Sequence, residues 1–194
     1  MSSPLTRNEM LTVFSEDELM LPSEELLGEI PDVDSREVLR TLGLPVWENP
    51  WFDMDDEISE RLQRVSDWDV GLADRFDEIP QGAEEWISLG TIPYDDIAFD
   101  ASTGVVYCLS DESGIYPFNS SLRNFIHFLY LLQSERPKFD IEHPRYEQEG
   151  EDDPEMTRRR VKDAMEEIDA AALENPDSRW HEVLDYIVDS ELHY

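Results

Sequence analysis

The spacing of hydrophobic residues changes twice along the chain and predicts three regions. The first has helical spacing over Asp34–Leu42, where Asp34 is placed as the N-terminal cap and Gly43 as the residue that ends the helix. A second helix is predicted over Asp56–Val65, whose apolar positions share one face. Between the two, prolines and acidic residues interrupt the aromatic-rich segment Val46–Met54, which we expect to be extended.

The central region contains short runs of β-branched and aromatic residues separated by turn residues, a pattern that predicts strands. These runs are Trp86–Leu89, Ile97–Asp100, Val105–Leu109 and Ile115–Phe118. The middle two are joined by Asp100–Gly104, where Gly104 can take the positive φ of a tight turn. Because the connections are short, we expect an antiparallel meander rather than parallel strands joined by helices.

The third region returns to helical spacing and predicts helices over Ser121–Gln133, Met156–Ile168 and Arg179–Glu191. The fold class predicted for the whole chain is α+β, with a central antiparallel sheet of about four to six strands flanked by N- and C-terminal helices. We expect three parts: a core over residues 1–135, an acidic linker or insert over 136–155, and a C-terminal helical extension over 156–194 that packs on the core.

The chain of 194 residues is strongly acidic, since 47 Asp and Glu residues against 15 Lys and Arg residues give a formal net charge of −32. Phosphate recognition needs clustered basic residues, so this excess argues against binding to nucleic acid or to an anionic membrane surface. With 40% hydrophobic and 10% aromatic residues, the chain can still form a core. Two explanations of the acidity stay open: a general adaptation such as that of halophile proteomes, or carboxylates that face a basic protein partner.

The compartment is predicted from the cysteine content and the N-terminus. Cys108 is the only cysteine, so no disulfide can form within the chain and a reducing compartment is favoured. The first ten residues lack the basic start and apolar run of a secretory signal peptide, and no apolar stretch is long enough for a membrane span. We therefore expect a soluble cytoplasmic protein.

Motifs for catalysis or cofactor binding are not recognisable in the sequence. The four histidines are scattered and the glycines form no phosphate-binding loop, so we predict no metal site, no cofactor and no enzymatic activity. Cys108 lies in a predicted strand and is interpreted as a buried small hydrophobic residue. Pairs of carboxylates carry no weight as catalytic dyads, because 47 acidic residues form many pairs by chance.

A series of short motifs follows in a specific order along the chain. It comprises Leu39–Pro45, Trp86–Gly90, Ile97–Asp100, the turn Ser102–Gly104, Val105–Tyr107, the helix start Asn119–Leu122, Ile168-Asp169 and Asn175–Trp180. This order resembles the SUKH superfamily, and more narrowly the bacterial SUKH-type immunity proteins whose sheet is followed by an Asn-Ser-Ser-Leu helix start. The likeness runs from about Asp34 to Tyr194. The acidic segment Glu147–Glu155 is larger than the connection usual in that group.

The resemblance implies an α+β fold and a cytoplasmic, non-enzymatic antidote. Members of the family bind toxin domains of polymorphic toxin systems, often domains that cleave or modify nucleic acids. The expected partner is therefore a cognate toxin domain, and the charge of this chain predicts that the domain is basic. The alternative is an adaptor or scaffold that binds a regulatory or secretion component, a role found in some superfamily members. Neither the identity of the toxin nor the oligomeric state follows from the sequence.

Candidate contact residues are carboxylates in predicted loops, together with one aromatic side chain. They are Asp53, Asp55, Asp56 and Glu57 beside the Trp-rich segment, Asp95, Asp96, Asp111 and Glu112 around the sheet, and Trp51 as an interface anchor. Each carboxylate can also be interpreted as an ordinary solvated acid. For the Trp-rich segment Trp47–Phe52, which contains Trp51, core packing is the favoured interpretation over an exposed anchor, because tryptophan is well suited to core packing.

Overall fold

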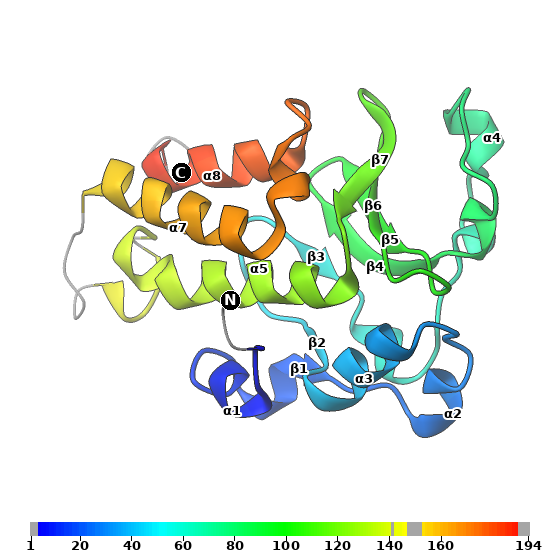
Figure 1. Cartoon of the computed structure of the whole chain (residues 1–194), viewed down its shortest axis with the longest axis horizontal. Helices are drawn as coiled ribbons and strands as arrows, with labels where there is room; N and C mark the ends of the chain where they lie inside the picture. Colours follow the sequence, from blue (N-terminus) through cyan, green and yellow to red (C-terminus); the bar gives the residue numbers. More distant parts are fainter. Residues whose placement is uncertain (1–3, 141, 147–152, 190–194) are drawn as a thin grey trace. The chain divides into compact units, whose positions relative to one another are not determined.

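The computed structural model describes residues 4–140, 142–146 and 153–189 (Figure 1). It has the α+β architecture expected from the sequence: a five-stranded antiparallel sheet, a two-stranded sheet, and flanking helices. The described residues fall into two compact units, one over Leu5–Ile126 and one that includes the chain from His127 onward. The division into parts at residues 135 and 155 stays a prediction, and most of the acidic segment 147–155 lies outside the described residues.

The first unit begins with short elements that precede the main sheet. They are the helices α1 (Arg7–Met10), α2 (Glu24–Leu27) and α3 (Val33–Thr41), and the antiparallel strands β1 (Leu19–Met20) and β2 (Leu44–Pro45). The predicted helix after residue 33 is confirmed as α3, but its cap is Asp32 and not Asp34. The Asp32 carboxylate accepts a hydrogen bond from the Ser35 N–H at 2.7 Å, and the Asp32 N–H donates to the Ala101 carbonyl, which holds Asp32 outside the helix.

The main sheet has the strand order β3-β4-β5-β6-β7, and every neighbouring pair is antiparallel. Its strands are β3 (Asp53–Met54), β4 (Ile87–Ile92), β5 (Asp95–Phe99), β6 (Val106–Ser110) and β7 (Gly114–Asn119). The four predicted strands correspond to β4 to β7, and the predicted meander is confirmed. The fifth strand, β3, lies at the end of the segment Val46–Met54 that was expected to be extended.

The turn between β5 and β6 forms as predicted, with Gly104 at φ +78°. The Asp100 carboxylate accepts hydrogen bonds from the Ser102 hydroxyl at 2.6 Å and from the Thr103 hydroxyl at 2.9 Å. Burial by itself raises the pKa of Asp100, but these hydrogen bonds outweigh the burial and hold the pKa below its ordinary value. The ionised carboxylate is therefore part of the turn.

We expect Ser102→Ala to raise the pKa of Asp100 and to lower the free energy of unfolding at pH 7 by about 1 kcal/mol. Because the folded-state pKa is lowered, ionised Asp100 stabilises the fold above about pH 4, the pKa of an unfolded Asp, and this contribution is lost as the pH falls through the folded-state value. An NMR titration of the Asp100 carboxyl carbon measures the pKa. Ser113→Ala in the β6–β7 turn is the control, and an unchanged Asp100 titration in Ser102→Ala would contradict the prediction.

The helix predicted over Asp56–Val65 is wrong. Only Asp56–Ser59 forms a 3-10 turn, and the backbone that follows pairs with the start of β4 instead. The Ser88 N–H donates to the Gln63 carbonyl at 2.8 Å, and the Val65 N–H donates to the Trp86 carbonyl at 2.9 Å. Pairing with the sheet and burial of Val65 thus replace the helical hydrogen bonds that the local pattern predicts.

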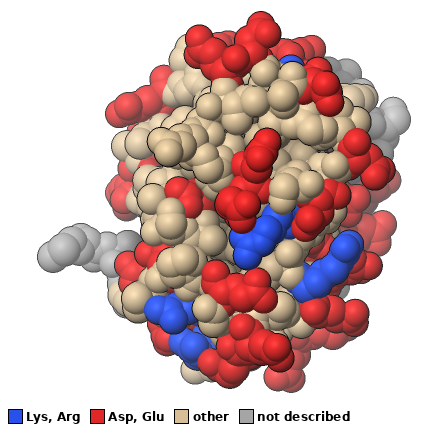
Figure 2. Space-filling view, turned by 90° about the vertical axis from the view of Figure 1, so that its right-hand side faces the viewer, with Lys and Arg blue, Asp and Glu red and all other residues tan. Residues whose placement is uncertain are grey.

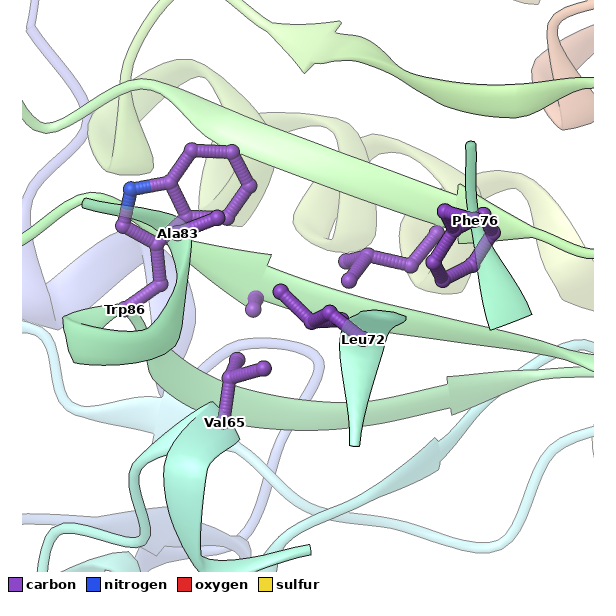
Figure 3. Close-up of a cluster of buried hydrophobic side chains, with 7 residues drawn as sticks. Val65, Leu72, Phe76, Ala83 and Trp86 are labelled. Carbon is purple, nitrogen blue, oxygen red and sulfur yellow. The ribbon is translucent and has the colours of Figure 1, made fainter. Parts of the chain in front are cut away.

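The segment from Val65 to Trp86 covers one face of the sheet (Figure 3). It contains the 3-10 turns Val65–Asp67 and Ala83–Glu85 and the helix α4 (Leu72–Arg75). Its buried side chains form a cluster with two sheet residues; the members are Val65, Leu72, Phe76, Ala83, Trp86, Ala98 and Leu109. Trp86 also stacks on Tyr107 of β6 with ring centroids 4.0 Å apart. This packing fixes α4 above the sheet.

The opposite face of the sheet carries the alternate residues of the same strands, and Ile97, Phe99 and Cys108 are fully buried there. Burial of Cys108 agrees with its interpretation as a small hydrophobic residue. The first turns of α5 (Leu122–Glu135) contribute Phe125, whose ring contacts Phe52 and Phe118. The helix begins as predicted, because the Asn124 N–H donates to the Ser121 hydroxyl at 3.2 Å.

Both edges of the main sheet are irregular. The edge strand β3 is two residues long and approaches β4 so closely that a Cβ on Gly90, at φ +132°, would lie 2.2 Å from the Asp53 carbonyl oxygen. The other edge strand, β7, contains the exposed Pro117, which has no N–H to donate.

The second unit contains most of α5 together with α7 (Pro154–Asp169) and α8 (Arg179–Asp189). All three helices were predicted, although residues 190 and 191 of the last lie outside the described part of the chain. Trp180 of α8 is fully buried, and its ring meets Phe128 of α5 edge-to-face with centroids 4.9 Å apart. Arg160 of α7 forms an ion pair with Glu135 of α5 at 2.6 Å.

Candidate partner-binding surface

Arg75, the last residue of α4, forms ion pairs with carboxylates of the main sheet and its β6–β7 turn. The Arg75 guanidinium lies 2.6 Å from the Asp96 carboxylate of β5 and 2.9 Å from the Asp111 carboxylate in the β6–β7 turn. It also lies over the rings of Phe76 and Trp68, at 5.0 and 5.9 Å from the centroids. Burial by itself lowers the pKa of Arg75, but the hydrogen bonds to the two carboxylates outweigh it and raise the pKa, so the guanidinium stays charged.

Arg75 lines two open hollows. The first, of about 320 Å³, is lined by Gln63, Asp67, Trp68, Asp69, Val70, Arg75 and Asp96. The second, of about 350 Å³, is lined by Arg75, Phe76, Asp77, Glu78, Asp111, Ser113, Gly114 and Ile115. Each hollow therefore has three carboxylates and shares one basic side chain. Figure 2 shows this side of the molecule, where red carboxylates surround uncharged surface and few blue side chains interrupt them.

The register of the sheet places Asp53 and Asp96 on the same face, although they are far apart in the sequence. Asp53 of β3 is the partner of Thr91 in β4, and Thr91 is the partner of Asp96 in β5. Directly paired residues of antiparallel strands point to the same face. Asp53 and Asp96 therefore stand in one row across three strands, about 10 Å apart.

The turn between β4 and β5 presents an aromatic side chain beside this row. Only Pro93 and Tyr94 separate the paired residues Ile92 and Asp95. Tyr94 has a positive φ of 71° and is the sole non-glycine residue with a positive φ in the described part of the chain. Its exposed fraction is 95%. A two-residue turn thus presents a tyrosine ring to solvent.

Comparison with known proteins identifies the family. The chain matches the family model described as SUKH-4 immunity protein over residues 5–186. The chain belongs to the SUKH-4 immunity protein family. This confirms the resemblance drawn from the order of motifs, and membership of an immunity family implies that the chain binds a toxin protein. No curated protein and no solved structure matches the sequence significantly.

In this SUKH-4 protein the remaining carboxylates beside the Trp-rich segment lie around one 3-10 turn, Asp56–Ser59. Asp55 caps it by accepting a hydrogen bond from the Glu57 N–H at 2.9 Å, and burial raises the pKa of Asp55. Glu57 forms an ion pair with Arg61 at 2.5 Å. Asp56 and Glu57 are exposed, whereas Asp55 is half-buried and accepts the hydrogen bond that caps the turn.

Two of the candidate contact residues are buried. Trp51 is 4% exposed and Asp95 is 3% exposed. The Cys108 thiol lies 3.9 Å from the Asp95 carboxylate, on the face of the sheet opposite the segment from Val65 to Trp86. Neither side chain is presented to solvent, so neither belongs to the exposed surface around Arg75 and Tyr94. Glu112 is exposed in the β6–β7 turn, where its N–H donates to the Ser110 hydroxyl. That these candidates contact a partner stays a prediction.

Sequence reasoning missed Arg75, Trp68 and Tyr94. Arg75 and Trp68 lie in a segment without regular periodicity, and only the folded chain brings them to the sheet. Tyr94 was missed because the predicted strands end at Leu89 and resume at Ile97, whereas the observed pairing of Ile92 with Asp95 leaves only Pro93 and Tyr94 in the turn.

Within residues 4–140, 142–146 and 153–189, no three His, Cys, Asp or Glu side chains are grouped so that they could hold a metal ion. Among the helices of these same ranges, none combines the length and the apolar character that a membrane span requires.

Replacing Arg75 with methionine is expected to lower the free energy of unfolding by about 1–3 kcal/mol, because two carboxylates lose their charged donor while the apolar stem is kept. Urea denaturation measures the change. Arg61→Met is the matched control: its ion pair with Glu57 is more than half exposed on both sides, so about 0.5 kcal/mol or less is expected. Equal losses in the two variants would contradict a bridging role for Arg75.

Proposed function

We propose that this protein is a cytoplasmic immunity protein that binds and neutralises the basic, nucleic-acid-targeting toxin domain of a polymorphic toxin system. The match to the SUKH-4 immunity protein family over residues 5–186 is the observation that carries the proposal. The net charge of −32 supports the basic nature of the partner.

The electric field of a toxin that acts on nucleic acid favours an acidic partner. An enzyme that acts on nucleic acid needs a cationic cleft for the phosphates, and an acidic protein is drawn to the same field. Opposite charges accelerate association, which allows capture of the toxin before it damages the cell, and the association rate falls as the salt concentration rises. Neutralisation then requires one antidote molecule for each toxin molecule and no catalytic step.

The test is co-expression of this protein with C-terminal domains of polymorphic toxins encoded beside its gene. We expect restored growth with one such domain and a stoichiometric complex that survives moderate salt. A growth defect that persists with every such domain would contradict the proposal. Affinity capture at low and moderate salt distinguishes an antidote from an adaptor, since several weaker partners from regulatory or secretion systems would indicate an adaptor.

A further inference from the structure

Tyr94 contributes little to the fold of the free protein. With an exposed fraction of 95%, its ring makes almost no contact with the rest of the chain. Its backbone, at φ +71°, occupies the left-handed region that disfavours a side chain with a Cβ. The second central residue of such a turn is usually Gly or Asn. A tyrosine here therefore opposes stability, and within the described part of the chain its ring gains almost no contact in return.

Residues that break a local rule in this way concentrate at functional sites, where the side chain serves a contact outside the fold. Tyrosine is also one of the residues that most often dominate the binding energy of protein interfaces. It presents a large apolar area with only two rotatable side-chain bonds, and its hydroxyl can accept or donate a hydrogen bond. Pro93 and the paired strands fix the backbone position from which the side chain projects before any partner arrives.

The surroundings of Tyr94 indicate the chemistry of the partner. The row that contains Asp53 and Asp96 begins two residues from Tyr94, about 7 Å along the strand. Asp53 is exposed and is not drawn into an ion pair within the described residues. Asp96 is held by Arg75 and opens onto the hollow of about 320 Å³, beside Val70 with an exposed fraction of 52%. An apolar anchor thus stands next to a carboxylate row.

We propose that the tip of the β4–β5 hairpin is the toxin-binding surface, with Tyr94 as the anchor and Asp53 and Asp96 facing Lys or Arg side chains of the toxin domain. The inference deepens the proposed function and rests on it. A basic surface fits both parts, because a cation can lie over the tyrosine ring or pair with the carboxylates. A second copy of this chain does not fit, since two molecules of charge −32 repel each other.

Tyr94→Gly separates binding from stability, since the affinity for the toxin domain is expected to fall while the melting temperature of the free protein does not fall. The probe is the toxin domain identified by neutralisation, inactivated at its catalytic residue. We expect the Kd to rise about 30-fold or more, the loss typical of an interface anchor. We expect the melting temperature of the free protein to stay the same or to rise, because glycine accepts the positive φ. Tyr94→Phe keeps the ring and should retain most of the affinity.

Asp53→Asn tests the carboxylate row without disturbing Arg75. We expect a slower association rate and a weaker dependence of that rate on salt. The controls lie at the other end of β5, where Asp32 bonds to Ala101: Asp34→Asn removes one exposed carboxylate, and Val33→Ala trims a side chain with an exposed fraction of 66%. Both controls should bind within about twofold of the wild type, as expected for residues outside an interface.

The outcomes separate the two proposals. If the wild-type protein is folded but neutralises and binds no such toxin domain, the proposed function fails. If the wild type binds and Tyr94→Gly binds equally well, only the inference about the hairpin fails. A lower melting temperature for Tyr94→Gly would also overturn it, because Tyr94 would then support the fold. The inference would also be overturned if the wild-type protein sedimented as a dimer and Tyr94→Gly as a monomer, because the hairpin tip would then bind a second copy of the chain.

Discussion

Replacing Gly90 with alanine is expected to lower the free energy of unfolding by about 3 kcal/mol or more. The new Cβ would lie 2.2 Å from the Asp53 carbonyl oxygen and 2.7 Å from the Met54 Cα, so it meets backbone atoms that have no rotamer to change. The φ of +132° adds strain for any residue with a side chain. Either β3 detaches from β4 or the whole edge of the sheet shifts.

Urea denaturation of the Gly90→Ala variant measures the loss. Gly114→Ala is the matched control, because Gly114 also has a positive φ, of 77°, but a Cβ there would meet no atom within 4 Å. The control isolates the conformational strain and should lose about 1–2 kcal/mol. If the free energy of unfolding falls equally in both variants, the close approach of β3 to β4 is not what excludes a side chain at Gly90.

Trp180→Ala is expected to destabilise the unit that contains α5, α7 and α8 by about 3–5 kcal/mol. Trp180 is fully buried, and its edge-to-face contact with Phe128 adds to the area that the ring removes from water. Truncation leaves a cavity beside Phe128, which is fully buried and belongs to the same unit.

Thermal and urea unfolding followed by circular dichroism measure this change. Met156→Ala on α7 is the control, since the Met156 side chain is 65% exposed and its truncation should alter the stability by about 0.5 kcal/mol or less. A loss below about 1 kcal/mol for Trp180→Ala would show that the helices do not pack around this residue as described.

The sequence predicted the fold well wherever periodicity and burial agree. Strands β4 to β7 combine β-branched residues with turn residues, and α5, α7 and α8 have a continuous apolar face, so local pattern and tertiary structure favour the same element. The pattern failed at Asp56–Val65, because backbone pairing of Gln63 and Val65 with the start of β4 outweighs a modest helical preference. No local pattern contains that information.

The candidate site was predictable only in part. The sequence indicated that Asp96 and Asp111 lie around the sheet, but their shared contact with Arg75 depends on a segment of irregular conformation. The row formed by Asp53 and Asp96 depends on strand register, which the sequence does not specify before the fold is known. Candidates such as Trp51 and Asp95 were chosen by residue type, and burial within the fold decided their exposure.

The irregular edges of the main sheet have a consequence for how specificity can evolve. A two-residue β3 and a β7 that contains Pro117 offer a poor template for an added strand, so a partner cannot easily be held by main-chain hydrogen bonds. Recognition then falls to side chains on loops and hairpin tips, which can be exchanged without disturbing the ladder beneath them. Such a scaffold can gain affinity for a toxin domain with a changed surface through surface substitutions alone.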